Sequence, residues 1–389
     1  MSTTASEAPE FSAQELADLI ESDTPFQIMD VRAPQKVAQA SIHLVPSERY
    51  HNIRGSELMN RTDPEATGLD PELPVAVICG RGKDSSVLAF HLNRLGFDAR
   101  SLAGGIAAWM NVLVPRELDP PQSLDRLVQF DRLGKGSLGY LLVSRGEAII
   151  IDLPLDARAY LDILEEEGAE LVGVFDTHAH ADYVSGGPEL AREFAVPYYL
   201  HAADGLYPYD GRPAEIDFHA LSDGDVIEFG DSTVTVVHTP GHTEGSVTYL
   251  VEDRVAFTGD FLFVESIGRP DLGGQEGRWG RELWSSVQRA KEAWNPGVMI
   301  YPAHYTSESE RRLGSAVGIS LEDLLEENEL LQIPSEEEFL EVILENKASF
   351  PDTYRKIKAL NLGLLSFQET EVEELEAGRN ECALGGVPS

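Results

Sequence analysis

Most of what this sequence predicts depends on the segment Thr177-His178-Ala179-His180-Ala181-Asp182-Tyr183. It follows the apolar run Leu171-Val172-Gly173-Val174-Phe175, whose length and β-branched residues are typical of a buried strand. A strand end is a rigid platform, and the two imidazoles and the carboxylate of the loop that follows can converge on one point. The segment therefore indicates a candidate metal site, although a polar loop without a metal fits the same residues.

Three later residues with ligand-type side chains occupy the same position, directly after a strand-like run. They are His242 after residues 233–237, Asp260 after residues 255–257, and His304 after residues 298–301. A polar loop gives no reason for this repeated placement, whereas ligands that meet at one ion require it. The four segments together favour a metal site.

This order of residues resembles the pattern of the metallo-β-lactamase superfamily, H-x-H-x-D-H followed by a later His, an Asp and a final His. The resemblance covers residues 125–389 and implies an αββα sandwich. The sequence departs from the pattern at Tyr183, where two-metal members have a histidine that helps to hold the second ion. A phenol with a pKa of about 10 is a weak ligand at neutral pH. Asp182 and His304 alone make a poor second position, so we expect one metal ion rather than two.

Within the superfamily the sequence is similar to the persulfide dioxygenases, a branch close to glyoxalase II. The resemblance implies that His178, His242 and Asp260 bind the metal. Two histidines and one carboxylate, with the other positions open, are typical of non-haem Fe(II) oxygenases. We therefore expect one Fe(II) per chain, with Zn2+ as the alternative metal.

Other residues of these motifs are expected to support the site. Asp182 and His304 would orient ligands or water, or bind the metal themselves. For His180 a hydrogen-bonded structural role and direct ligation stay open.

Two further segments are similar to parts of the persulfide dioxygenases. Gly268-Arg269-Pro270-Asp271 resembles their G-R-x-D, which implies that Arg269 lies by the substrate, and Tyr183 is assigned to the same surroundings. Alternatively Arg269 only pairs with Asp271 and shapes a loop. Asn380-Glu381-Cys382 resembles a terminal N-x-x-C, one residue shorter, and we interpret Cys382 as a tail thiol rather than a pocket residue.

Residues 1–115 predict a separate α/β domain. A capping box, Ser12-Ala13-Gln14-Glu15, opens a short helix. Strand-like runs at 26–31, 75–78 and 97–102 alternate with helical segments, which indicates a parallel sheet flanked by helices. The run at 75–78 delivers Cys79 at its end. The helix that follows offers five apolar residues to the core: Val87, Leu88, Ala89, Phe90 and Leu92.

This domain resembles a rhodanese domain in its D-V-R at 30–32, its C-G-R-G-K-D-S at 79–85 and its G-G-x-x-x-W at 104–109. A thiol at a helix N-terminus, with main-chain N–H groups around it, is stabilised as the thiolate and can carry sulfur as a persulfide. The loop that would hold this persulfide consists of Gly80, Arg81, Gly82, Lys83, Asp84 and Ser85. A tyrosine phosphatase needs arginine where Ser85 stands, so phosphatase activity is disfavoured. The alternative is a silent rhodanese fold in which Cys79 is merely buried.

Residues 116–124 contain Pro120 and Pro121 and predict a short linker. Residues 125–389 then form the second domain, ending in a helical extension. Its expected elements are strands at 127–130, 138–143 and 148–153, and helices at 157–167 and from Ser335 onward.

Composition limits the partners. The net charge of −37 argues against nucleic acid, whose phosphates would be repelled. Excess acidic residues along the whole chain, with only 7 lysines among 30 basic residues, are typical of a surface adapted to high salt. The alternative, an acidic interaction tail, fits less well because the charge is not confined to one block.

Location is constrained by what the sequence lacks. No apolar run approaches the length of a membrane span, and MSTTASEAPEF has no signal-peptide features. Two distant cysteines fit a reducing cytoplasm. A homo-oligomer is compatible with the sequence, which does not determine the oligomeric state.

Three functions follow as hypotheses. The first is an Fe(II) persulfide dioxygenase that converts a low-molecular-weight thiol persulfide and O2 to sulfite and thiol. It would be coupled to a sulfurtransferase domain, in which Cys79 moves sulfane sulfur between that thiol, thiosulfate or another carrier and the domain. The second is a zinc thioester hydrolase of glyoxalase II type. The third is a sulfur carrier or sensor without turnover.

Overall fold

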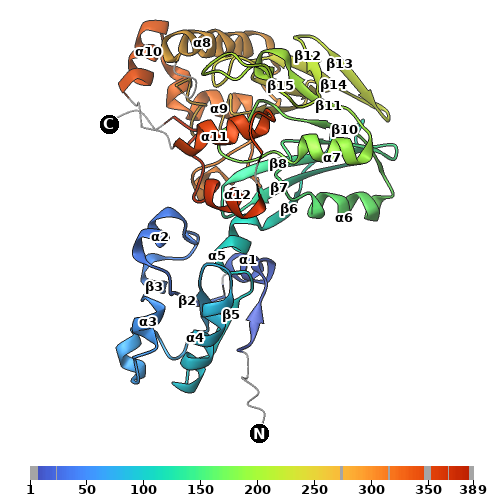
Figure 1. Ribbon diagram of the computed structural model, residues 1–389. Helices are drawn as coiled ribbons and strands as arrows, with labels where there is room; N and C mark the ends of the chain where they lie inside the picture. The colour runs from blue at the N-terminus through green and yellow to red at the C-terminus, as the bar shows by residue number, and fades with distance from the viewer. Residues whose placement is uncertain are drawn as a thin grey trace. The chain divides into compact units, whose positions relative to one another are not determined.

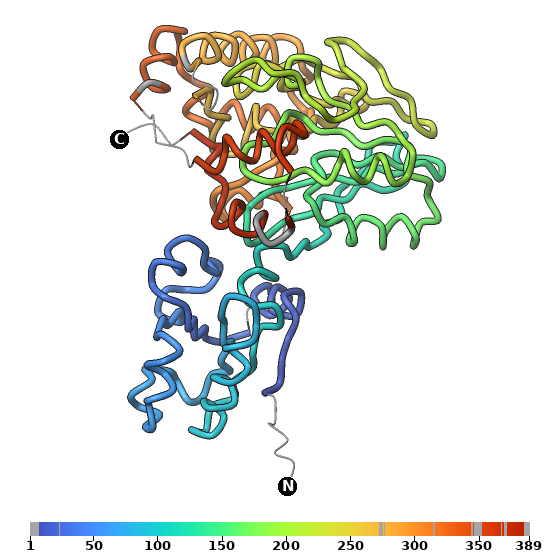
Figure 2. Tube along the Cα trace, in the orientation of Figure 1, coloured from blue at the N-terminus to red at the C-terminus, as the bar shows by residue number. Residues whose placement is uncertain are grey.

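The computed structural model describes residues 8–22, 24–271, 275–313, 316–345, 352–366 and 368–384 (Figure 2). The chain divides into two compact units. Unit 1 comprises Met1–Val114, Arg132–Lys135 and Ala377–Arg379, and unit 2 comprises Pro115–Asp131, Gly136–Glu376 and Asn380–Ser389. The prediction that the N-terminal segment has no signal-peptide features rests largely on residues 1–7, and these lie outside the described residues.

Unit 1 contains one five-stranded sheet in the order β1-β5-β4-β2-β3, with every strand pair parallel. The strands are β1 (Glu10–Phe11), β2 (Gln27–Asp30), β3 (Tyr50–Asn52), β4 (Val75–Ile78) and β5 (Ala99–Leu102). The helices are α1 (Ala13–Glu21), α2 (Pro34–Gln39), α3 (Gly55–Leu58), α4 (Lys83–Arg94) and α5 (Gly105–Asn111), with 3-10 turns η1 (Ser47–Arg49) and η2 (Pro64–Thr67). This confirms the parallel α/β sheet.

The core of unit 1 lies on both faces of this sheet because successive residues of a strand point to opposite sides. Val75 and Val77 of β4 pack in the cluster that contains Leu88 and Leu92 of α4. Its alternate residues, 76 and 78, pack in a second cluster with residues of α1 and α5. The alternation explains why β4 reads as a continuous apolar run.

Helix α4 corrects one detail of the prediction. Val87 and Phe90 are 58% and 39% exposed, so their assignment to the core is wrong. The buried positions are Ser85, Leu88, Ala89 and Leu92, which follow the spacing of one helix face. Residues 87 and 90 lie off that face.

The capping box of α1 is confirmed, since Ser12 Oγ accepts from the main-chain nitrogen of Glu15 and the Glu15 carboxylate accepts from the main-chain nitrogen of Ser12.

Unit 2 contains two sheets. The seven-stranded sheet has the order β12-β11-β10-β9-β8-β7-β6 and the six-stranded sheet the order β13-β14-β15-β16-β17-β18. The first consists of β6 (Leu113–Glu117), β7 (Arg126–Arg132), β8 (Ser137–Ser144), β9 (Glu147–Ile151), β10 (Glu170–Phe175), β11 (Tyr198–His201) and β12 (His219–Leu221). The second consists of β13 (Val226–Phe229), β14 (Ser232–His238), β15 (Val247–Val251), β16 (Val255–Gly259), β17 (Met299–Pro302) and β18 (Ile319–Ser320).

Helices lie on opposite sides of this unit, with α6 and α7 on one side and α8 and α10 on the other (Figure 1). The helices are α6 (Arg158–Glu167), α7 (Gly187–Phe194), α8 (Glu276–Ala293), α9 (Leu321–Glu327), α10 (Glu336–Glu345), α11 (Asp352–Asn361) and α12 (Glu369–Leu375), with 3-10 turns η3 (Ala202–Gly205), η4 (Glu308–Glu310) and η5 (Glu329–Gln332). One apolar cluster joins side chains of both sheets, such as Phe175 of β10 and Phe257 of β16, with Leu283 of α8. The αββα sandwich is therefore confirmed.

The segment predicted as a linker begins inside a strand. Arg116 and Glu117 belong to β6, at the edge of the seven-stranded sheet. Pro115 is tolerated in this strand because an edge strand can spare the missing donor. Arg116 is buried, with its Nη2 3.3 Å from Oδ2 of Asp131. The division of the chain at 115 and 125 stays a prediction.

The strands that precede the motif residues run to one edge. β14 and β15 are antiparallel, as are β15 and β16, whereas β16 and β17 are parallel. The carboxyl ends of β14, β16 and β17 therefore meet at the same edge of the sheet. The main-chain oxygen of Thr177, after β10, accepts from the nitrogen of Val247 at 2.9 Å, which brings the first motif to the second sheet.

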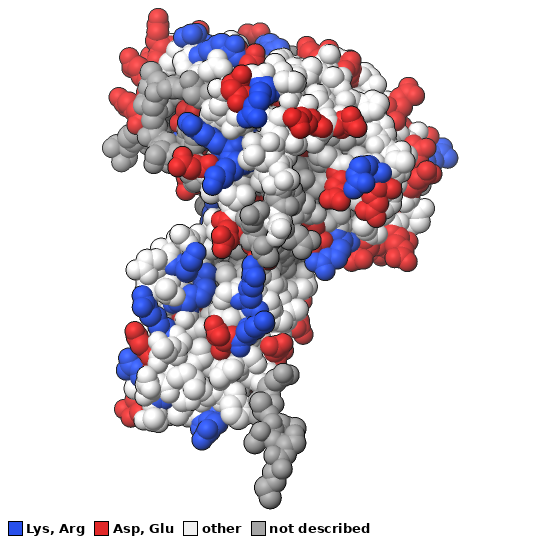
Figure 3. Space-filling view, in the orientation of Figure 1, with Lys and Arg blue, Asp and Glu red and all other residues white. Residues whose placement is uncertain are grey.

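Charge is distributed widely on the surface. On the face drawn in Figure 3, acidic side chains occur over both units and are interspersed with basic ones. Among the described residues, every helix is too short or too polar to span a bilayer.

Candidate metal centre

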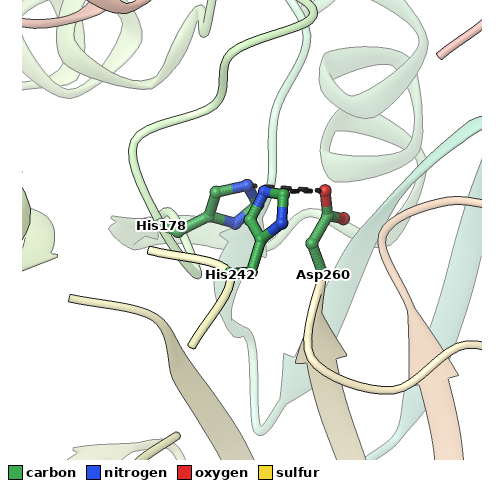
Figure 4. Close-up of side chains that lie close together, drawn as sticks. All are labelled: His178, His242 and Asp260. Atoms are coloured by element: carbon green, nitrogen blue, oxygen red, sulfur yellow. Dashed lines mark ion pairs between the residues drawn. The ribbon is translucent and has the colours of Figure 1, made fainter. Parts of the chain in front are cut away.

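Two imidazoles and one carboxylate converge in unit 2 (Figure 4). His178 Nε2 lies 3.7 Å, and His242 Nε2 3.3 Å, from Oδ2 of Asp260, and all three side chains are buried. None of these three atoms has a hydrogen-bond partner within the described part of the chain. Because buried polar atoms without partners are costly and rare, their convergence fits a metal ion held by two nitrogens and one oxygen. The structure thus brings the three predicted ligands together, and metal binding by them stays a prediction.

Thr177 and Asp152 orient the His178 ring. Thr177 donates to Asp152 Oδ1 from its main-chain nitrogen at 2.7 Å and from its hydroxyl at 3.0 Å. The hydroxyl oxygen lies 3.0 Å from His178 Nδ1 and accepts the proton of that nitrogen. This leaves the Nε2 lone pair for a metal. Burial, with His180 adding to it, lowers the pKa of His178 well below its ordinary value, so the ring is neutral.

The segment from Gly268 to Asp271 orients His242. The main-chain oxygen of Arg269 lies 3.0 Å from His242 Nδ1 and places the proton there. A Cβ at Gly268 would lie 1.7 Å from the main-chain oxygen of Asp260, so only glycine allows this approach. Burial lowers the pKa of His242 to about 4, which keeps its Nε2 free of a proton.

His304 lies between two carboxylates. Its Nδ1 is 2.6 Å from Oδ1 of Asp260 and its Nε2 is 2.9 Å from Oδ2 of Asp182. Burial alone would lower the pKa of His304, but the two carboxylates raise it to about 10, so that both ring nitrogens donate. His304 therefore holds Asp260 so that its second oxygen faces His178 and His242.

Cys382 corrects the prediction for the C-terminal segment. It is fully buried, and its Sγ lies within 4.8 Å of ligand atoms of both Asp182 and His304. The interpretation as a tail thiol is wrong because Tyr354 holds the segment: its hydroxyl accepts from the main-chain nitrogen of Glu381 at 2.8 Å and its ring packs with Cys382. The premise that Asp182 and His304 lack a third donor is therefore wrong as well.

His180 and Tyr183 belong to a separate buried cluster. His180 Nε2 lies 3.1 Å from Asp152 Oδ1 and 2.9 Å from the Tyr183 hydroxyl. These hydrogen bonds fit the structural role, whereas His180 Nδ1 has no partner in the described part of the chain, so direct ligation by His180 stays open as well. The Tyr183 hydroxyl also contacts His180 rather than the three converging atoms, so the substrate contact assigned to it has no support. Burial, followed by the charge of Asp152, raises the pKa of Tyr183 well above its ordinary value and keeps the phenol neutral.

Arg269 pairs with Asp271 and shapes the loop, and its contact with the substrate stays a prediction. Its Nε and Nη2 each donate to the Asp271 carboxylate at 2.7 Å, and its Nη1 donates to the main-chain oxygen of Glu381 at 3.2 Å. Because its side chain is buried, these contacts hold both the loop that orients His242 and the segment that carries Cys382.

Cys79 in unit 1 lies at the end of β4 in a tight loop. Its Sγ accepts hydrogen bonds from the main-chain nitrogen of Gly82 at 3.1 Å and from the hydroxyl of Ser85 at 3.2 Å. The thiol is 3% exposed. A Cβ at Gly105, whose φ is +63°, would lie 2.5 Å from the main-chain oxygen of Cys79. The loop therefore closes around the sulfur as predicted for a main-chain cradle.

The charged members of this loop lie at its surface. Arg81, Lys83 and Asp84 have exposed side chains, and the two hydrogen bonds to the sulfur come from neutral groups. Ser85 occupies the position where a phosphatase would carry arginine, and its hydroxyl contacts Cys79. The transfer activity of Cys79 stays a prediction.

Sequence comparison places these sites in known families. A family model described as "Metallo-beta-lactamase superfamily" matches residues 134–304, and one described as "Rhodanese-like domain" matches residues 12–112. Over 204 residues the chain is 30% identical to the probable polyketide biosynthesis zinc-dependent hydrolase BaeB of Bacillus velezensis. The aligned region covers 52% of this chain and 84% of the relative. The chain belongs to the metallo-β-lactamase superfamily.

Other members of the superfamily differ in the activity that their names state. The chain is 32% identical over 206 residues to the mitochondrial persulfide dioxygenase ETHE1 of Bos taurus, covering 50% of this chain and 77% of the relative. A crystal structure of a metallo-beta-lactamase from Staphylococcus aureus superimposes with a TM-score of 0.53 at 24% identity, over 66% of this chain and 75% of that one, and supports the fold alone. A hydrolase and a dioxygenase are thus about equally similar, so the choice between them depends on the site itself.

Some residues that build this metallo-β-lactamase site were not predicted. Asp152 follows β9 directly and adopts a φ of +56°, so the rule that found His178 and Asp260 would have found it too. Asp204 accepts from the main-chain nitrogens of Ala179 at 2.7 Å and Gly245 at 2.9 Å, and thereby ties the two histidine loops together. It lies in η3, where no pattern in the sequence indicates it.

Helix α11 also contributes residues that the sequence did not indicate. Tyr354, Lys358 and Asn361 are spaced four and three residues apart, so they share one face of the helix. Asn361 Nδ2 donates to the main-chain oxygens of His180 and Tyr183, each at 2.9 Å. The helix is thereby fixed on the first motif, with Lys358 one turn earlier.

Proposed function

We propose that the protein is an Fe(II)-dependent persulfide dioxygenase that oxidises a low-molecular-weight thiol persulfide with O2. The observation that carries this proposal is the convergence of two imidazole nitrogens and one carboxylate oxygen, all buried and without other partners. Such a set leaves other coordination positions open, as non-haem iron oxygenases require. Tyr183, a neutral phenol turned to His180, is no substitute for the missing imidazole of a two-metal site.

The proposed reaction is balanced without a further reductant. One persulfide anion, one O2 and one water give sulfite, the free thiol and a proton. The outer sulfur loses four electrons, and O2 accepts them. Bound iron would supply the positions at which the sulfur and O2 react.

The chain itself supplies the orientation of the ligands. Asp152, through Thr177, and the main-chain oxygen of Arg269 fix the two histidine tautomers. His304 fixes the carboxylate of Asp260. These partners keep the three ligands in place before the metal binds, which is the role that such surrounding hydrogen bonds have in metal sites.

Oxygen uptake by the iron-loaded protein, with a thiol persulfide as substrate and sulfite measured as product, tests this proposal. The wild type should consume O2, and His178→Ala should lose both iron and O2 uptake. His219→Ala, at an exposed histidine of the same unit, is the matched control and should keep both. Absence of O2 uptake by wild-type protein with one iron per chain would remove the proposal.

The rhodanese-like unit is proposed to exchange sulfane sulfur through Cys79 with a carrier such as thiosulfate. The contacts of Cys79 with Gly82 and Ser85 support this role, because hydrogen bonds to a sulfur stabilise its anion. A second site on the same chain raises the effective concentration of persulfide at the first.

We also propose that the first domain comprises residues 1–115, the linker residues 116–124 and the second domain residues 125–389.

A zinc-dependent thioester hydrolase is the second candidate, and one observation favours it. Asp182, His304 and Cys382 bring a carboxylate, an imidazole and a thiol within 4.8 Å of one another, a donor set that suits Zn2+. Elemental analysis of protein purified without chelators separates the candidates. Two zinc ions per chain, falling to one in Cys382→Ser, together with thioester turnover, would establish the hydrolase. One iron in both proteins supports the dioxygenase.

A further inference from the structure

Lys358 is a buried cation without a partner. Its side chain is 2% exposed, and within the described part of the chain its ammonium makes neither a hydrogen bond nor an ion pair. Burial lowers the pKa of Lys358 because it removes water from the ammonium, although nearby negative charges act in the opposite direction. A buried charge without compensation is costly, and this sequence contains only 7 lysines. The position of Lys358 therefore needs an explanation other than packing.

Two of the negative charges that act on Lys358 have other contacts or roles. Asp204, Cys382 and Asp260 are the groups whose charge acts on the ammonium. Asp204 accepts from two main-chain nitrogens and from the Thr243 hydroxyl at 2.8 Å. Asp260 is a predicted metal ligand, so its charge would be shared with the metal. Among the described residues, these carboxylates therefore make no direct ion pair with Lys358.

Lys358 lies at the wall of a cavity of about 160 Å3, whose lining includes neighbours in sequence of the predicted metal ligands. Ala179 and Thr243, the neighbours in sequence of His178 and His242, line the same cavity. Two carboxylates also line it, but Asp204 is engaged as described and Glu244 pairs with Arg278. Lys358 is therefore the cationic group that this cavity offers to a ligand.

The fixed position of α11 indicates that Lys358 is aimed at this point. Asn361 binds the main-chain oxygens of the first motif, and Tyr354 binds the segment that carries Cys382. Lys358 lies between them on the same helix face, one turn from each. These contacts fix the backbone from which the Lys358 side chain extends.

We propose that Lys358 binds the anionic end of the substrate beside the metal, so that the site selects a persulfide or product sulfite as the anion. This inference rests on the proposed function for the identity of the substrate, whereas the anion site itself does not. A neutral disulfide or thioether presents no charge to Lys358 and binds more weakly.

A structural alternative is that Lys358 only balances the charge of Asp204. The two roles predict opposite effects on stability. If Lys358 is kept for binding, removing the buried charge in Lys358→Met raises the melting temperature of the protein without ligand, as at other binding sites that trade stability for function. If it only balances Asp204, the same substitution lowers the melting temperature, and a Lys358→Met protein that fails to fold overturns the proposal.

Binding of inorganic sulfite to the metal-loaded full-length protein, measured anaerobically by calorimetry at fixed ionic strength, provides the test. Lys358→Met should weaken sulfite binding by at least about tenfold, the effect of losing one charge-assisted contact. Lys358→Arg, which keeps the charge, should retain most of the affinity. Lys356→Met removes an exposed lysine of the same helix and should bind sulfite as the wild type does. Equal sulfite affinity of Lys358→Met and wild type, with equal metal content, overturns the proposal.

The outcomes separate this inference from the proposed function. If the wild type fails to consume O2 but its sulfite binding depends on Lys358, the dioxygenase is removed and the anion site stands. If the wild type consumes O2 and Lys358→Met still binds sulfite normally, only the anion site is removed.

Discussion

The main-chain oxygen of Arg269 lies 3.0 Å from Nδ1 of His242, so the G-R-x-D segment acts on the metal site through its backbone. The Arg269 side chain holds that backbone through Asp271 and Glu381. Arginine is suited to this task because its planar fork bonds a carboxylate with two parallel hydrogen bonds.

Arg269→Ala should therefore weaken metal binding by about 10–100-fold, the range found when a partner of a ligating histidine is lost. The measurement is a competition titration of the metal-free protein with a chelator of known affinity. Arg281→Ala, at an exposed arginine of α8, should leave the affinity unchanged. Unchanged affinity in Arg269→Ala would show that the loop keeps its shape without the side chain.

The residues of the site that were predicted from sequence share a local signal. His178, His242 and Asp260 each follow a strand within a few residues, and a strand end can be recognised from an apolar run alone. The same reasoning located several strands of both sheets of unit 2 and the loop of Cys79. Sequence patterns of this kind reach as far as one element and the turn that follows it.

The residues that escaped prediction depend on contacts between distant segments. Lys358 lies in an amphipathic helix whose sequence resembles any surface helix, and only the packing of α11 on the first motif buries it. Cys382 was misassigned for the same reason, because the contact of Tyr354 with the Glu381 main chain brings it to the site. Val87 was misassigned because apolarity alone does not say which helix face is covered.

Asn361→Ala should destabilise unit 2. The Asn361 side chain satisfies the main-chain oxygens of His180 and Tyr183 and the main-chain nitrogen of Ser185, all buried. Leaving several such groups without partners should cost about 2–4 kcal/mol of the free energy of unfolding.

Urea unfolding followed by tryptophan fluorescence measures this effect in unit 2, because three of the four tryptophans lie there. Asn295→Ala is the matched control, since Asn295 is exposed and its side chain accepts from the main-chain nitrogen of Gly297 in the same turn. A loss no larger than that of the control would mean that α11 is held by its apolar contacts alone.

Gly105→Ala should disable the sulfur-transfer loop and spare the metal site. The added Cβ would lie 2.5 Å from the main-chain oxygen of Cys79 and 2.8 Å from the nitrogen of Arg81, so the loop around the sulfur must shift. Transfer of sulfur from thiosulfate to cyanide should fall at least about tenfold, because a small displacement of reacting groups has effects of this size. Cys79→Ser should abolish the transfer.

Gly68→Ala separates this clash from backbone strain. Gly68 also has a positive φ, of +73°, but a Cβ there has nothing within 4 Å. The Gly68→Ala protein should therefore keep the transfer activity. O2 uptake should persist in Gly105→Ala, Cys79→Ser and Gly68→Ala. Full transfer activity in Gly105→Ala would show that the observed loop is not the active arrangement.

The surface charge predicts a requirement for salt. With 67 acidic and 30 basic residues, self-repulsion opposes the folded state, and it is screened only when the Debye length becomes short. The melting temperature should rise as potassium chloride is increased from about 0.1 M, where the Debye length is about 10 Å, to about 1 M, where it is about 3 Å. Circular dichroism measures the transition at each concentration. An uncharged osmolyte such as sucrose stabilises by exclusion rather than by screening, so in dilute buffer it should not replace the salt. A melting temperature that is the same in dilute buffer and in concentrated salt contradicts salt adaptation and would leave the excess of acidic residues to be explained by a partner.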